Sequence, residues 1–305
     1  MKKITNTKDA LDISKTTNLT LNIFLTILAI MCVYPLIFIF MISISSTESI
    51  AKNGYQIIPA GFTLEAYRYI FKSAHQLLQS YWITIVITVF GTIFSVLITT
   101  LYAYAISRDD FRFKRMFTFI AIFPMLFSGG LVPFYMISSQ LLHFNNSLLG
   151  LIMPLALNSF FILILRTYFR TSTIKSLIEA AKIDGAGEFR ILFQIVIPLS
   201  LPGIATIALF TALAYWGDWF NALLFIDTPN LTPIQAMLMN IQNNLLFISQ
   251  NAGAFSANST EMIRNLPTDA AKMAIVVLAT VPIIFAYPFC QRYFIRGLTV
   301  GGVKE

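Results

Sequence analysis

The stretch "KSLIEAAKIDGAGEFR", from Lys175 to Arg190, lies in a chain of which only 11% is charged. Six of its sixteen residues carry a charge, and long apolar runs flank it on both sides. The charged residues are Lys175, Glu179, Lys182, Asp184, Glu188 and Arg190. Such a stretch between two apolar runs indicates a segment that lies in water, and the rest of the fold can be worked out from it toward both ends.

The apolar residues in and beside this stretch predict two short helices. One face of the first helix is marked by the spacing i, i+3, i+4 and i+7 at Ile174, Leu177, Ile178 and Ala181. Gly185 then interrupts the pattern, because glycine readily adopts the backbone angles that end a helix. We expect Asp184 to be the N-cap of the second helix. The small residues at the bend would let another backbone approach closely.

The composition indicates a membrane protein. Of the 305 residues 57% are hydrophobic, and the mean hydropathy is +0.74. Apolar runs of about 18 residues or more are typical of membrane-spanning helices. The chain has six such runs, at Leu19–Ser43, Tyr81–Ser107, Met116–Ser138, Leu148–Leu165, Gly203–Ile226 and Met273–Gln291. The sequence therefore predicts an all-α membrane protein with six transmembrane helices.

The distribution of charge predicts the orientation. If both ends of the chain lie in the cytoplasm, 16 of the 21 Lys and Arg residues fall in cytoplasmic segments. Membrane proteins keep their basic residues on that side. The net charge of +7 thus reflects topology, and we expect no nucleic acid as a partner. The expected location is a plasma membrane, with several spans and both termini cytoplasmic.

The runs divide the chain into expected segments. The outer connection at residues 44–80 is long, and the one at residues 227–272 is longer and rich in Asn, Gln, Ser and Thr. Residues 81–291 form the expected core membrane domain, which includes the charged loop 173–198 and the outer loop 227–272. The remaining segments are a cytosolic tail at 1–18, a first transmembrane helix at 19–43, an extracellular loop at 44–80 and a cytosolic tail at 292–305.

Several classes of activity lack their motifs. A phosphate-binding loop needs Lys after its second glycine, and Val303 follows Gly302 where the glycine spacing fits. The two histidines share no metal-ligand spacing with Cys or carboxylates, and no nucleophile and base recur together. The first apolar run is longer than the ~7–15 residues of a signal-peptide core. We therefore expect a chain that is not itself an enzyme and that binds no metal or cofactor.

A second candidate site lies in the fifth apolar run, in "AYWGDWFNALLF". Asp218 is the only charged residue within the six runs. A carboxylate in a membrane helix usually faces the bundle interior or a water-filled path. An aromatic belt at the membrane surface would explain the tryptophans equally. If the cluster lines a substrate path, its residues are Trp216, Asp218, Trp219 and Asn221.

The longer string "EAAKIDGAGEFRILFQIVIPLSLP", from Glu179 to Pro202, resembles the EAA loop of bacterial ABC importer permeases. That pattern is Glu-Ala-Ala, three residues, Gly, nine residues, Ile, one residue and Leu-Pro. Ile197 replaces the usual Leu. The triplet "DGA", Asp184 to Ala186, is similar to the one common in the sugar-importing branch of these permeases. The residues that the resemblance assigns to coupling with an ATPase are Glu179, Ala180, Ala181, Asp184, Gly185 and Ala186.

The resemblance extends over most of the chain. "IIPAGFTLEAYRYIF" (Ile57–Phe71) and "RGLTVGGVKE" (Arg296–Glu305) are similar to the second permease subunit of maltose-type importers. The resemblance implies a type I ABC importer permease fold with a cytoplasmic EAA coupling helix. The implied partners are a second permease subunit, two cytosolic ATPase subunits that use ATP and Mg, an extracytoplasmic solute-binding protein, a sugar substrate and membrane lipid.

Two alternatives remain open at this point. The first is an ABC importer permease for a solute other than a sugar. The second is a secondary transporter driven by an ion gradient, which would need further intramembrane charges to bind the coupling ion. A membrane scaffold without transport would leave the spacing of the EAA pattern unexplained.

Overall fold

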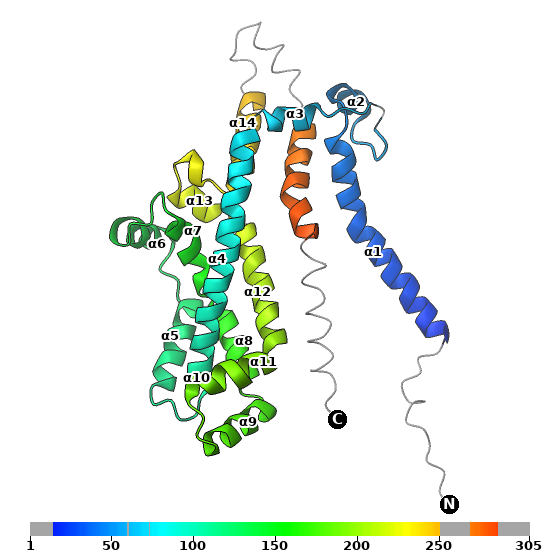
Figure 1. Ribbon diagram of the computed structural model, residues 1–305. Coiled ribbons are helices and arrows are strands. Elements are labelled where there is room, and N and C mark those ends of the chain that lie inside the picture. Colours follow the sequence, from blue (N-terminus) through cyan, green and yellow to red (C-terminus); the bar gives the residue numbers. More distant parts are fainter. Residues whose placement is uncertain (1–14, 60, 73, 251–268, 286–305) are drawn as a thin grey trace, which may run out of the picture. The chain divides into compact units, whose positions relative to one another are not determined.

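The computed structural model in Figure 1 describes residues 15–59, 61–72, 74–250 and 269–285. Regular structure in these residues is helical, apart from one isolated bridge between Ser45 and Phe62. The chain divides into two units. The first comprises Met1–Ile70 with Ile248–Val277, and the second comprises Phe71–Phe247 with Leu278–Glu305.

The first unit begins with one long helix. The helix α1 (Lys15–Ser43) has 29 residues, or about 44 Å at 1.5 Å per residue, which exceeds the ~30 Å core of a bilayer. Its side chains are exposed from residue 16 to residue 37. The short helices α2 (Thr47–Asn53) and α3 (Glu65–Phe71) follow. The expected outer loop 44–80 therefore contains helices.

The second unit holds the remaining named helices. The longest is α4 (Ala74–Ser107), which begins seven residues before the expected span at Tyr81. The others are α5 (Lys114–Leu126), α6 (Leu131–Met136), the π-helical η2 (Ile137–Leu141), α7 (Leu148–Ala156), α8 (Ser159–Phe169), α9 (Ser172–Ile183), α10 (Glu188–Ile191), the π-helical η3 (Leu192–Val196), α11 (Ile197–Leu199), α12 (Leu201–Trp216), α13 (Phe220–Phe225), the 3₁₀ turn η4 (Pro229–Leu231) and α14 (Ile234–Gln250).

The helix α4 forms the centre of this unit and packs against α7, α8 and α12 (Figure 1). The close approach to α12 depends on Gly91. A Cβ atom at this position would lie 2.6 Å from Cζ of Tyr215. Tyr215 is fully buried, and its hydroxyl donates to the carbonyl of Ile152 over 2.7 Å. One tyrosine ring thus joins α4, α7 and α12.

Several of the expected spans are bent. Among the described residues, two helices are long and apolar enough to cross a membrane, and five spans result if each of three bent pairs counts as one. The bends are 119° between α5 and the α6–η2 helix, 48° between α7 and α8, and 79° between Glu188–Leu199 and α12. Gly130 has φ +87° at the first bend. At the second, the Asn158 side chain accepts hydrogen bonds from the amides of Phe160 and Phe161 and so begins a new helix.

The last part of the chain differs most from the expected spans. The fifth run is interrupted at residues 217–219, so Asp218 lies between α12 and α13 and not inside a helix. The expected outer loop 227–272 contains η4 and α14, whose buried residues Ile234, Leu238 and Leu245 share one face. Residues 269–285 are helical, and the end of the expected sixth span lies outside the described residues.

Candidate functional site

The α9–α10 loop, residues 172–191, is the structure of the opening stretch. Two helices are present, and Gly185 between them has φ +76°, a left-handed conformation that favours glycine. Asp184 ends α9 as its C-cap, and Gly187 is the N-cap of α10. The expectation that Asp184 begins the second helix is therefore wrong. The chain needs residues 185–187 to complete the turn before a new helix can begin.

One face of α9 belongs to the interior of the protein. Ile174, Ile178 and Ala181 are buried in the same apolar cluster as Leu165 and Phe169 of α8. Leu177, the fourth residue of the predicted stripe, is 41% exposed. Ala181 thus packs inward, and Ala180 is the exposed alanine of the pair. The inner face of α9 is therefore part of the same apolar core as residues of α4, α8 and α12.

The opposite face and the bend are open. Ile183 is 88% exposed and Phe189 is 77% exposed, although both are large apolar residues. Glu179 and Asp184 are exposed and form no ion pair or side-chain hydrogen bond with another described residue. Apolar side chains of this size beside unpaired carboxylates are typical of a surface that a partner protein covers.

A charged turn, residues 108–113 between α4 and α5, holds the loop. The carboxylate of Asp109 forms ion pairs with Nζ of Lys114 over 2.7 Å and with Nζ of Lys175 in α9 over 3.2 Å. Asp110 pairs with Lys182 of α9. The hydrogen bonds from Lys114 and Lys175 lower the pKa of Asp109 to about 2, so its carboxylate is ionised at neutral pH.

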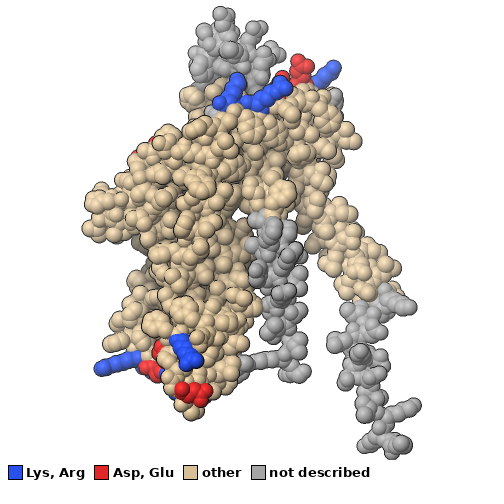
Figure 2. Space-filling view, in the orientation of Figure 1, with Lys and Arg blue, Asp and Glu red and all other residues tan. Residues whose placement is uncertain are grey.

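Glu188 connects α10 to the same turn. Its carboxylate accepts from the hydroxyl of Tyr104 in α4 and lies 3.3 Å from Nη2 of Arg108 and 3.1 Å from Nζ of Lys182. Figure 2 shows blue and red atoms gathered at the end of the second unit that carries α9 and α10, with tan atoms along its helices. This charged cluster fixes α9 and α10 on α4.

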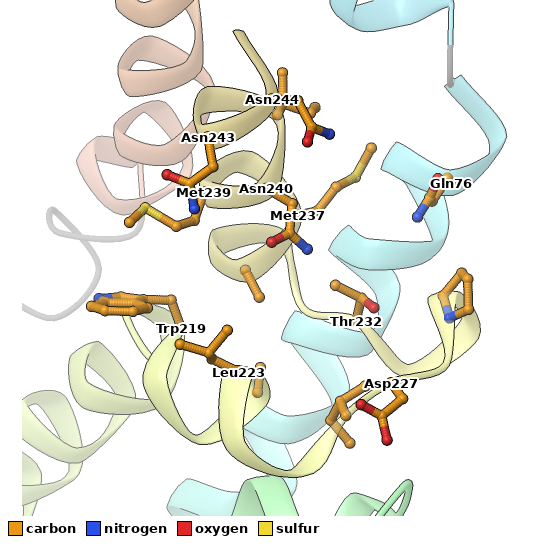
Figure 3. Close-up of a pocket in the computed structure, with 15 residues that line it drawn as sticks. Gln76, Trp219, Leu223, Asp227, Thr232, Met237, Met239, Asn240, Asn243 and Asn244 are labelled. Atoms are coloured by element: carbon orange, nitrogen blue, oxygen red, sulfur yellow. The ribbon is translucent and has the colours of Figure 1, made fainter. Parts of the chain in front are cut away.

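A second candidate lies where α13 and α14 meet the start of α4. It is an open hollow of about 500 Å³, which we call the amide pocket (Figure 3). Its lining combines one tryptophan, one carboxylate, four side-chain amides and several apolar groups. The residues are Gln76, Trp219, Ala222, Leu223, Ile226, Asp227, Pro229, Thr232, Ala236, Met237, Met239, Asn240, Ile241, Asn243 and Asn244.

Polar contacts to α4 and to one asparagine hold the walls of the amide pocket. The hydroxyl of Thr84 in α4 accepts from the amide of Ile234 over 2.8 Å, which fixes the first turn of α14. The side-chain oxygen of Asn146 accepts from the amides of Asp227 and Thr228 over 2.7 and 3.2 Å. Asn146 itself has φ +49°, a conformation that asparagine tolerates better than most residues.

Of the four predicted path residues, only Trp219 lines the amide pocket. Trp216 donates its indole N–H to the carbonyl of Ala279 over 3.3 Å. Asp218 accepts from the backbone and side-chain amides of Asn221 over 3.1 and 2.8 Å, and Asn221 is buried. Asp218 therefore stabilises the first turn of α13, and Trp216 and Trp219 do not lie on one continuous helix because α12 ends between them.

Sequence reasoning missed most of the amide pocket. Asn240, Asn243 and Asn244 occur in "NIQNNLLFISQ", which was interpreted as part of a polar loop. The signal was the apolar residues at helical spacing between those amides. Gln76 precedes the expected second span and gave no signal of its own. Within the described residues, no group of three or more His, Cys, Asp and Glu side chains is arranged to hold a metal ion.

Comparisons with known proteins show the family of the chain. Residues 110–300 match the family described as "Binding-protein-dependent transport system inner membrane component". The polygalacturonan/rhamnogalacturonan transport system permease protein YtcP of Bacillus subtilis is 37% identical over 92% of this chain and 96% of its own length. The arabinooligosaccharides transport system permease protein AraQ of Halalkalibacterium halodurans is 29% identical over 91% and 93%.

A solved structure has the same fold. It is a bacterial ABC transporter involved in the import of the acidic polysaccharide alginate. One of its chains is 31% identical to this chain and superposes on it with a TM-score of 0.76. The match covers 92% of this chain and 99% of the other. The predicted all-helical ABC importer permease fold is thereby confirmed.

Proposed function

Because the chain belongs to the family of binding-protein-dependent transport system inner membrane components, we propose that its cargo is an oligosaccharide and that the α9–α10 loop receives the ATPase. Membership makes it a multi-pass permease component, which leaves no place for an ion-coupled secondary transporter. The importers of this family depend on a binding protein for their solute. The proposed assembly further contains a second permease subunit and two cytosolic ATPase subunits, which use ATP and Mg.

The names of the relatives support the cargo. The relatives include permeases for polygalacturonan, arabinooligosaccharides, galactooligosaccharides and maltodextrin. These substrates differ in sugar and linkage but are all carbohydrate chains. A solute that is not a sugar, such as a peptide or a lipid, has no comparable support. We therefore assign the chain to an oligosaccharide importer.

The observation that carries the docking proposal is the exposed tip of the loop. Ile183 and Phe189 flank a left-handed Gly185, and no atom within 4 Å would meet a Cβ added there. A groove on an ATPase could enclose this tip and bury both apolar side chains. Glu179 and Asp184 then offer carboxylates to basic residues of the partner.

The inner face of α9 supports the coupling. Ile174 and Ile178 are buried in an apolar cluster that includes residues of α4, α8 and η3, and Lys175 and Lys182 pair with the charged turn at the end of α4. When the ATPases close, the loop moves with them, and it can move only by carrying α4 and α8 along. The permease then alternates between inward-open and outward-open states.

The proposal includes the topology. Both termini, the charged turn and the α9–α10 loop lie in the cytoplasm, and six spans cross the membrane. Labelling of intact cells with a membrane-impermeant thiol reagent tests this in a variant without Cys32 and Cys290. Cysteine in place of Asn230 should react and cysteine in place of Lys182 should not. The reverse pattern would overturn the orientation.

Reconstitution tests the function itself. The complete importer, in vesicles with its binding protein, is expected to accumulate labelled oligosaccharides only when ATP is supplied. The measured quantities are sugar uptake and phosphate release in the same vesicles. A peptide of similar mass serves as the control cargo. Uptake of the peptide without uptake of any oligosaccharide would contradict the assignment.

A further inference from the structure

We propose that the amide pocket is a saccharide-binding site of this chain and that it selects neutral sugar rings over uronate rings. The proposal rests on the proposed function only for the general class of cargo. The volume of the amide pocket, about 500 Å³, lies in the range of small-molecule sites. It would give this subunit its own contact with the cargo, separate from the solute-binding protein.

The first argument is the aromatic platform. Trp219 lies in the break between α12 and α13, and 40% of its surface is exposed. Phe220 contacts it edge-on, with ring centroids 5.8 Å apart and an interplanar angle of 84°, which restrains the indole. Tryptophan combines a large apolar face with a polar N–H. The apolar C–H face of a sugar ring fits such a surface.

The second argument is the set of unpaired amides. Figure 3 shows Asn240 and Asn243 on the α14 side of the pocket and Trp219 on the α13 side, with Gln76 on α4. None of these amides, nor that of Asn244, forms a hydrogen bond with another described side chain or backbone group. Each amide can donate and accept at once. Sugar hydroxyls have the same double capacity, so they are suitable partners for these groups.

The third argument concerns charge. The described lining contains no Lys, Arg or His, and its one ionisable group is the exposed carboxylate of Asp227. A uronate ring would bring a second carboxylate beside Asp227 without a cation to pair with it, and like charges at close range repel. A neutral ring has a hydroxymethyl or methyl group at that position. The described lining therefore offers no cation to the carboxylates of an acidic polysaccharide such as alginate.

Two sugars of the same linkage and size test the proposal. The α-1,4-linked galactotriose and trigalacturonate differ only in the oxidation state of C6. Their binding to the purified importer in nanodiscs is measured by saturation-transfer NMR, without binding protein or ATP. Galactotriose, or maltotriose in its place, should bind at least about tenfold more tightly than trigalacturonate, because an unpaired charge is costly to desolvate. Equal or tighter binding of trigalacturonate would overturn the selectivity.

Two variants locate the binding in this pocket. Trp219→Ala should weaken the binding of the neutral trisaccharides about five- to tenfold, whereas Trp82→Ala, at an exposed position outside the pocket, should not. Asp227→Arg should raise the affinity for trigalacturonate about tenfold by adding a charge-assisted hydrogen bond. No change in either variant, or no binding of any of these sugars, would overturn the proposal.

The same experiment separates this inference from the proposed function. If the importer takes up oligosaccharides and Trp219→Ala leaves their binding unchanged, the pocket assignment fails and the function stands. If the pocket binds galactotriose and the importer with its binding protein moves no oligosaccharide, the function fails and the pocket assignment stands.

Discussion

The charged cluster and the amide pocket lie near opposite ends of α4. They differ in whether their polar side chains are paired with other residues. At one end, Lys175, Lys182 and Glu188 are paired with the charged turn, so their charges hold α9 and α10 in place. At the other end, Asn240 and Asn243 have no partner among the described residues. Paired groups position an element, and unpaired groups remain available to a ligand. The α9–α10 loop contains both kinds, since Glu179 has no ion pair or side-chain hydrogen bond within the described residues.

The largest expected effect comes from Gly91, which connects the two regions through α4. Gly91→Ala forces Cβ against the ring of buried Tyr215. Overpacking of this kind costs about 1–3 kcal/mol. Thermal unfolding of the purified complex should begin at a lower temperature, and both regions should loosen together.

Gly129→Ala is the matched control for Gly91, because nothing lies within 4 Å of a Cβ at that glycine. Its unfolding should follow that of the unchanged protein. An unchanged midpoint for Gly91→Ala would show that α4 and α12 can separate without consequence for either region.

The next effect is confined to the α9–α10 loop. Gly185→Ala strains a residue with φ +76°, which costs about 1–2 kcal/mol for a residue other than glycine. We expect fewer sugar molecules to be transported for each ATP hydrolysed, with the complex still inserted in the membrane. The ratio of uptake to phosphate release in reconstituted vesicles measures this.

Gly187→Ala provides the comparison two residues away. Its φ is −72° and no neighbour lies within 4 Å of a new Cβ, so coupling should be preserved. Equal ratios for the two variants would remove the bend from the coupling mechanism and leave the loop a passive surface.

A smaller effect is expected at the amide pocket. Asn146→Ala removes the acceptor of the Asp227 and Thr228 amides, and each lost hydrogen bond is worth about 0.5–1.5 kcal/mol. Hydrogen exchange of these two amides should accelerate, whereas exchange in α9 should not change. Asn145→Ala, at an exposed neighbour, is the control. Slow exchange in Asn146→Ala would mean that other contacts hold the pocket wall.

The smallest effect concerns pH. The pKa of Asp109 is lowered to about 2 in the folded protein, and its value in an unfolded chain is about 3.9. A lowered pKa gives stability that is present above pH 4 and is lost as the pH falls through 2. The difference in unfolding midpoint between the unchanged protein and Asp109→Asn should therefore be constant from pH 7 to about 4.5. A difference that disappears by pH 6 would show that the charged turn does not hold Asp109 ionised.

The sequence predicted the α9–α10 loop well because its signals are local. Helical spacing, a glycine and the EAA pattern all lie within the 29 residues from Ile174 to Pro202. The error at Asp184 concerned which residue caps which helix, and this depends on how many residues the turn consumes. That Ala181 faces the interior and Ala180 faces solvent was beyond the pattern, because it depends on where α8 lies.

The spans and the amide pocket were harder to predict for one physical reason. Hydropathy reports whether a run is apolar and not whether it is one straight helix, so the bends near Gly130 and Asn158 were not expected. The amide pocket combines Gln76, Trp219 and Asn240, which lie up to 164 residues apart. Only the packing of α14 on α4, through contacts such as Thr84 with Ile234, brings them together.

The central claim is that the tip of the α9–α10 loop receives the ATPase, and photochemical cross-linking tests it most directly. A photoreactive benzoylphenylalanine replaces Ile183, which is 88% exposed, in membranes that contain the natural importer. The same residue replaces Asn230 near the amide pocket as a control. We expect irradiation to join the ATPase to the chain from position 183 and not from position 230. Absence of an ATPase adduct at 183 in an assembled, transporting complex would contradict the account.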